Sequence, residues 1–169
     1  MGFFVFHAKV QSLIYEKSDI EWNMAQLTKR IKDVQNYADM LGKRKIQPSD
    51  LFSMPASMLG RTINYLNYAH NSSLAYMNQN APYFQQMMQQ AGQTDPRMIE
   101  FMKKKLYEQG RDRALEIATK YLKQEEEALV AEKDKLSLRL EEVKKDMQES
   151  QTARKEGLDA LMPKYTGLS

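Results

Sequence analysis

Apolar residues in the first part of the chain recur at alternating steps of three and four. The pattern starts at Phe3 and keeps its phase to Leu41, with Lys17 as the one polar interruption. A 3.5-residue repeat places these side chains along one line of a helix, as knobs-into-holes packing requires. We predict a coiled-coil helix over residues 3–41. Its interaction seam consists of Phe3, Phe6, Val10, Leu13, Ile20, Met24, Leu27, Ile31, Val34, Ala38 and Leu41.

A second long helix is predicted over residues 95–162. The tripeptide TDP opens it with a capping residue and a proline at the first helical position, and the next proline is Pro163. Gly110 and Gly157 are its weak points, because glycine costs about 1 kcal/mol relative to alanine inside a helix. The downstream half keeps one phase of three and four residues. The seam there consists of Leu129, Leu136, Leu140, Val143 and Met147.

The upstream half of this helix, up to residue 122, spreads its apolar residues over a wider arc. A wide apolar stripe needs more than one neighbouring helix, whereas a narrow seam needs one. We therefore expect a helical bundle around residues 50–122 and a coiled-coil arm beyond it. Whether the two long helices run parallel or antiparallel is left open by the sequence.

The segment of residues 42–94 has a different composition. Between Arg61 and Asp95 it contains no charged residue and is rich in Asn, Gln, Tyr and Met. Helical spacing of apolar residues predicts a loop, then a helix over residues 57–79 and a short helix that starts at Pro82. Gly42 is expected to end the first helix in a left-handed conformation.

The fold class that follows is all-α, with long coiled-coil terminal helices and a short central helical bundle segment. Windows rich in β-branched residues with alternating polarity are few, so sheets are not expected. At 169 residues the chain has the length of one domain. We predict a single elongated helical domain over residues 1–169, with a tail at 163–169.

Composition argues against most kinds of chemistry. The net charge of +3 comes from mixed signs, so no nucleic-acid partner is expected. Absence of cysteine excludes disulfides and thiolate sites, and the two histidines, His7 and His70, have no convergent partners in sequence. Phosphate-binding loops, dinucleotide glycine patterns and nucleophile elbows are absent. We expect no enzyme activity, no metal and no cofactor.

The opening MGFFVF lacks the basic n-region of a signal peptide. The N-myristoylation motif requires Ser or Thr at position 6, and this position is Phe6. Phe4 and Val5 lie off the seam, which leaves a membrane-inserting tip as an alternative, although membrane contact is not expected. No apolar run approaches the ~20 residues that span a bilayer. The localisation is left unknown, and we expect either the cytoplasm or export by a non-Sec route.

The uncharged segment supplies a candidate assembly surface. An Asn, Gln, Tyr and Met surface can be desolvated against a neighbouring molecule without burying ions. The alternative is that residues 62–94 form the core of the chain's own bundle, and the sequence leaves both open. The candidate residues are Tyr83, Phe84, Gln86, Met87 and Gln89.

The helical termini, the absence of cysteine and the absence of a signal peptide resemble needle and filament subunits of type III secretion systems and flagella. Export chaperones and stalks of those machines are similarly long helical hairpins. This resemblance is architectural and transfers no residues. It favours a structural protein that assembles with copies of itself into a homo-oligomer or filament, as a component or substrate of a secretion machine. The alternative is a soluble coiled-coil adaptor or chaperone that holds another helical protein in an export or particle-assembly machine.

Overall fold

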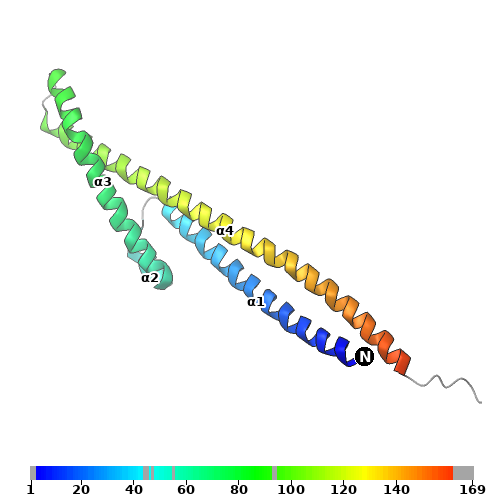
Figure 1. The fold of residues 1–169 in the computed structure, drawn as a ribbon. Helices are drawn as coiled ribbons and strands as arrows, with labels where there is room; N and C mark the ends of the chain where they lie inside the picture. Colours follow the sequence, from blue (N-terminus) through cyan, green and yellow to red (C-terminus); the bar gives the residue numbers. More distant parts are fainter. Residues whose placement is uncertain (1–2, 44–45, 47, 55, 93–94, 162–169) are drawn as a thin grey trace, which may run out of the picture. The chain divides into compact units, whose positions relative to one another are not determined.

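The structure is a computed structural model that describes residues 3–43, 46, 48–54, 56–92 and 95–161 (Figure 1). These residues form the helices α1 (Phe3–Gly42), α2 (Pro48–Ser53), α3 (Ala56–Gln90) and α4 (Pro96–Leu161). Helices hold 96% of the described residues, and none of these residues lies in a strand. The prediction of an all-α fold is confirmed. The expected tail at 163–169 lies outside the described residues.

The chain divides into two compact units. Unit 1 contains Met1–Lys32 and Glu127–Ser169, and unit 2 contains Asp33–Glu126. Helices α1 and α4 therefore contribute to both units, while α2 and α3 belong to unit 2 alone. The sequence placed the change of packing in the last helix after residue 122, and the boundary between the units follows Glu126.

In unit 1, α1 and α4 form an antiparallel pair (Figure 1). Arg139 donates hydrogen bonds to Glu16 Oε1 from Nε at 3.0 Å and from Nη2 at 2.7 Å. Arg154 Nη1 lies 3.4 Å from His7 Nδ1, so earlier residues of α1 meet later residues of α4. The orientation that the sequence left open is decided by these contacts. The core of this unit consists of Leu13, Ile20 and Val143, with Met24, Leu136, Leu140 and Met147 packed against them.

In unit 2, α3 packs closely on the first part of α4. A Cβ atom added to Gly110 would come within 2.7 Å of the Cα of Ser73. Ala69 and Ala114, each one turn along the helix from Ser73 and Gly110 respectively, are buried. The buried hydroxyl of Ser73 donates a hydrogen bond to the carbonyl oxygen of Ala69 at 2.5 Å. The small polar side chain at this contact therefore has a hydrogen-bond partner. Small residues on both helices allow this close approach.

Helix α3 corrects the prediction of two helices in this region. It continues through Pro82, where a break had been expected. Proline removes one N–H from a helix and crowds the carbonyl four residues earlier, but packing can hold both sides in line. Phe84 and Met88, beyond the proline, line a small hollow together with Met102 of α4. These residues place the part of α3 beyond Pro82 beside α4.

Two further differences concern the ends of the helices. Gly42 is the last residue of α1 and is not left-handed, whereas Gly92, with φ of 71°, ends α3. The N–H of Gly92 donates to the carbonyl of Gln89 at 3.1 Å, as in a left-handed helix end. The predicted loop after Gly42 also contains the six-residue helix α2.

Candidate interaction surfaces

The predicted seam is buried within the chain. Val10, Leu13, Ile20, Leu27, Val34 and Leu41 of α1 are buried, as are Leu129 and Val143 of α4, and the remaining described members are half-buried. The side chain of Phe3 lies outside the described residues. In unit 1, Leu13 and Ile20 of the seam pack with Val143 of α4 in one core. The seam therefore joins α1 to α4 of the same molecule and does not present a free surface.

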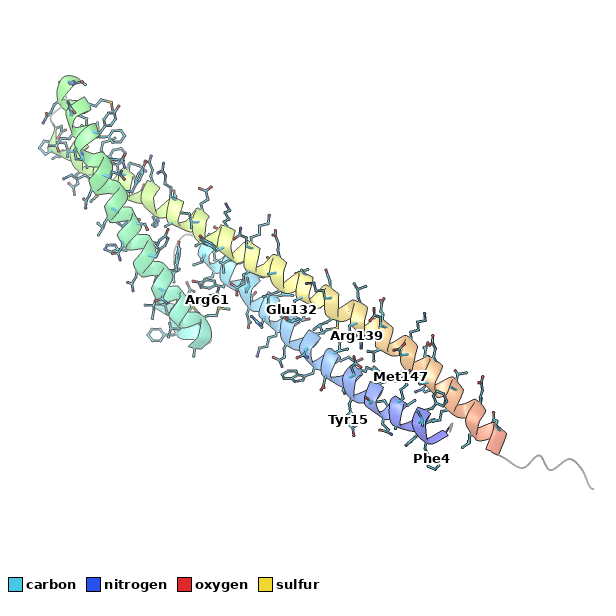
Figure 2. The ribbon with its side chains drawn as sticks, viewed as in Figure 1. Phe4, Tyr15, Arg61, Glu132, Arg139 and Met147 are labelled. Carbon is cyan, nitrogen blue, oxygen red and sulfur yellow. The ribbon has the colours of Figure 1, made fainter. Side chains whose placement is uncertain are left out.

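Helix α1 carries a second line of residues on the side opposite the seam, which we call the outer stripe. These residues also follow steps of three and four, and every one is exposed and uncharged. Tyr15 is 70% exposed and Trp22 is 64% exposed. Figure 2 shows Tyr15 projecting from α1 on the side away from α4. The outer stripe consists of Ala8, Gln11, Tyr15, Ser18, Trp22 and Ala25.

The outer stripe was not predicted from the sequence, although its signal was present there. The predicted helices were based on the most apolar positions, and a line of alanine, serine and glutamine does not form a hydrophobic repeat. The informative feature was the absence of charge along one line of the helix over residues 8–25, in a chain with 28% charged residues. Charged residues of α1 such as Lys9, Glu16 and Asp19 lie off this line.

The aromatic residues at the start of α1 lie on the sides of the helix that the heptad pattern predicted. Phe6 is half-buried on the seam, while Phe4 and Val5 are exposed off it. Among the described residues, no helix combines the length and the apolar character needed to cross a membrane. The exposed Phe4 and Val5 extend the apolar surface at the start of α1.

The uncharged segment turns out to contribute both to the core and to the surface. On one face of α3, Thr62, Ala69, Ser73 and Met88 are buried. The opposite face is exposed and dominated by side-chain amides, and we call it the amide stripe. The amide stripe consists of Asn64, Asn67, Asn71, Ala75, Asn78, Pro82, Gln85 and Gln89.

The candidate assembly surface divides in the same way. Tyr83, Gln86, Met87 and Gln89 are exposed, as expected of a surface. Phe84 is half-buried and faces the hollow against α4. Four of the five candidate residues are thus available for contact with another molecule.

At the other end of α3, an ion pair joins this helix to α4. The guanidinium of Arg61 pairs with the carboxylate of Glu125 and lies 5.7 Å from the ring centre of Tyr37. A hollow of about 280 Å³ lies beside them, lined also by Tyr65 and Tyr121. Because its one basic group is already paired with its one carboxylate, this hollow holds no free charged group that could act as a general acid or base.

Burial raises the pKa of two tyrosines that line this hollow. It raises the pKa of Tyr37, against the opposing effects of a hydrogen bond with Thr62 and the charge of Arg61. Burial also raises the pKa of Tyr65. Both phenols are therefore neutral near pH 7. In the part of the chain that the structure describes, no group of three or more His, Cys, Asp or Glu side chains could hold a metal ion.

Comparison of the chain with protein-family models, with curated proteins and with solved structures found no match. The inferences about function therefore rest on the chain's own exposed surfaces. Among the described residues, the outer stripe of α1 and the exposed side of α3 are the long helix faces without charge.

Proposed function

We propose that the protein is a non-enzymatic helical structural subunit that assembles with copies of itself into a homo-oligomer or filament. The observation that supports this function is the exposed side of α3. From Ile63 to Gln90, no exposed residue of this helix is Asp, Glu, Lys or Arg. The exposed side chains of the charged helix α4 provide the contrast within the same molecule.

Helix propensity alone does not account for the composition of α3. Lys, Glu and Arg are good helix formers, and more than half of the exposed positions of α4 in unit 1 are charged. Asparagine is a poorer helix former, and each exposed Asn costs a few tenths of a kcal/mol relative to Lys or Glu. The amide stripe contains Asn at four of its positions. An interface explains why a less favourable residue type recurs there.

Side-chain amides are suited to contact with another copy of the same chain. Each Asn or Gln offers two donors and one acceptor oxygen, so amides can hydrogen-bond across an interface. Desolvating them costs far less than desolvating unpaired ions. Exposed Tyr83 and Met87 of α3 lie outside the amide stripe and offer apolar area on another side of the same helix.

Burial of the seam within the chain changes where contacts between copies are proposed. The sequence offers two places for self-contact, the seams of the terminal helices and the uncharged segment. Because these seams pack within the chain, the proposed contacts lie on the exposed sides of the helices. A role in a secretion machine stays part of the proposal and rests on the architectural resemblance: subunits and chaperones of such machines are also long helical hairpins.

The test uses single charges that change side-chain size very little. Gln86→Glu and Gln89→Lys place a charge on an exposed position of α3. Helix content and unfolding of the monomer should stay as in the parent, while assembly weakens by ~1–3 kcal/mol per contact because a buried charge loses its hydration. Gln151→Glu, on the exposed charged side of α4, is the matched control and should assemble like the parent.

Sedimentation velocity over a range of concentrations measures the assembly. A parent protein that stays monomeric at all concentrations would show that the proposal is wrong. If both α3 variants and the control assemble equally well, residues 86–89 lie outside the interface.

A second function, an adaptor or chaperone for another helical protein, is favoured by one observation. The described part of the seam is covered within one molecule, so a second copy is not needed to cover it. Exposed Met87 and Met98 give a surface that adapts to varied partners, since methionine is flexible and polarisable. A stable monomer that forms a stoichiometric complex with another protein would support this alternative over self-assembly.

A further inference from the structure

We propose that the amide stripe of α3 in one copy docks on the outer stripe of α1 in another copy. This inference rests on the proposed self-assembly and names the two surfaces that meet. It makes the contact heterologous, since each copy contributes a different surface.

Charge limits which surfaces can cover the amide stripe. An ion left unpaired in a dry interface costs several kcal/mol, so the opposing surface should be free of charges along its length. The exposed side of α4 in unit 1 fails this criterion, because exposed charged residues such as Asp134, Glu141 and Lys145 recur along it. The outer stripe meets it over residues 8–25.

Hydrogen bonding favours contact of the outer stripe with the amide stripe over contact between two outer stripes. The indole N–H of Trp22 is a donor without an acceptor function, and the hydroxyl of Tyr15 also needs a partner when it is buried. If two outer stripes packed together, the acceptors for the indole N–H would be Gln11, Ser18 and the Tyr15 hydroxyl. The amide stripe offers an acceptor oxygen at six of its eight positions.

Shape leads to the same pairing. The amide stripe consists of Asn, Gln, Ala and Pro and contains no large aromatic side chain. Tyr15 and Trp22 supply such side chains, and a buried aromatic residue contributes roughly 150–250 Å² of contact area. Small Ala75 lies near the middle of the amide stripe and leaves room for a large side chain from the opposing helix. Large groups on one surface thus face small and polar groups on the other.

Length is compatible with this docking. Residues 8–25 of α1 cover about 26 Å and residues 64–89 of α3 cover about 38 Å at 1.5 Å per residue. The whole outer stripe therefore fits on the amide stripe. A heterologous contact leaves one unused stripe at each end of a pair, so association continues into a ring or an open filament.

Cysteine cross-linking tests the pairing directly, because the chain contains no cysteine. Single cysteines replace exposed residues along each stripe, and proteins with different stripes are mixed and mildly oxidised under assembly conditions. Tags of different mass distinguish mixed from self-linked dimers. The panel is Gln11→Cys, Ser18→Cys and Ala25→Cys on α1, with Asn67→Cys, Asn71→Cys and Asn78→Cys on α3 and Gln151→Cys on α4 as the control.

We expect at least one mixed α1–α3 disulfide to exceed both self-linked dimers at least fivefold, and the control to link with neither stripe. Self-linked α1 or α3 dimers as the main product would overturn the docking inference and leave self-assembly standing. The same conclusion follows if the parent assembles but no pair in the panel links. A parent that stays monomeric overturns the proposed function itself.

Fluorescence gives an independent readout, because Trp22 is the only tryptophan. Copies with Asn71→Glu and Asn78→Glu have a charged amide stripe but keep an intact outer stripe. Mixed with an excess of Trp22→Phe copies, which keep an intact amide stripe, their Trp22 emission should shift to shorter wavelength. No shift in that mixture, while the parent shifts on assembly, would contradict docking between unlike stripes.

Discussion

The substitution Gly110→Ala tests the closest contact between helices in unit 2. A Cβ atom at position 110 would lie 2.7 Å from the Cα of Ser73, 3.1 Å from the Cβ of Tyr76 and 3.3 Å from the carbonyl oxygen of Ser73. Two of these atoms belong to the backbone, so no side-chain rotation can relieve the contact. The helices α3 and α4 must move apart to accept the methyl group.

Two opposing effects determine the size of the change. Alanine in place of glycine inside a helix adds about 1 kcal/mol of stability through intrinsic propensity. Overpacking a close contact typically costs 1–3 kcal/mol, and separating α3 from α4 also loosens the buried Ala69 and Ala114. We expect a net loss of up to ~2 kcal/mol in the free energy of unfolding, opposite to the direction that helix propensity alone would give.

Gly60→Ala is the matched control. Gly60 lies inside α3, and no atom comes within 4 Å of a Cβ built there. This variant should gain about 0.5–1 kcal/mol, because it has the propensity benefit without the steric cost. Urea unfolding followed by circular dichroism measures both variants against the parent. If Gly110→Ala is as stable as Gly60→Ala, the two helices do not approach each other through Ser73.

The remaining predictions concern the seam and a buried tyrosine. Leu27→Asp places an unpaired charge in the seam and should cost several kcal/mol in unfolding experiments, whereas exposed Glu21→Ala should change stability by less than ~0.5 kcal/mol. Equal effects would contradict the assignment of the seam. Burial raises the pKa of Tyr37 above its usual value of 10.0 in the folded protein. The neutral phenol therefore contributes fully to folding stability below the pKa of the unfolded state, and this contribution is lost as the pH rises through the pKa of the folded state. Tyr37→Phe should therefore lose less stability than the parent between pH ~8 and ~11, and equal losses would contradict a buried phenol at this position.

Much of the fold could be predicted from local pattern. The steps of three and four from Phe3 to Leu41 predicted α1 to within one residue of its observed end, because a single apolar line is a property of the helix itself. The absence of proline between residues 97 and 162 likewise predicted α4 as one helix. Local rules were wrong where packing outweighs them. Pro82 was expected to interrupt α3, but the helix is continuous, and residues beyond the proline line a hollow together with α4.

The partner of each surface could not be predicted in the same way. A seam indicates that a helix will be covered, but the same apolar line fits a helix of another molecule or a helix of the same chain. The antiparallel packing of α1 on α4, with Glu16 beside Arg139, assigned the seam to the chain's own core. Gly110 appeared in the sequence as a weak point of a helix, and the close approach of Ser73 shows it to be required by packing.

The absence of charge in residues 62–94 was visible in the sequence, whereas its meaning depended on the tertiary structure. A helix with no charged residue can be buried on all sides or exposed on one side, and composition is the same in both cases. Packing of α3 on α4 through Ala69 and Ser73 buried one face and left the amide stripe exposed. Sequence periodicity determines which residues share a face of a helix; which face meets solvent is decided by neighbours that lie far apart along the chain.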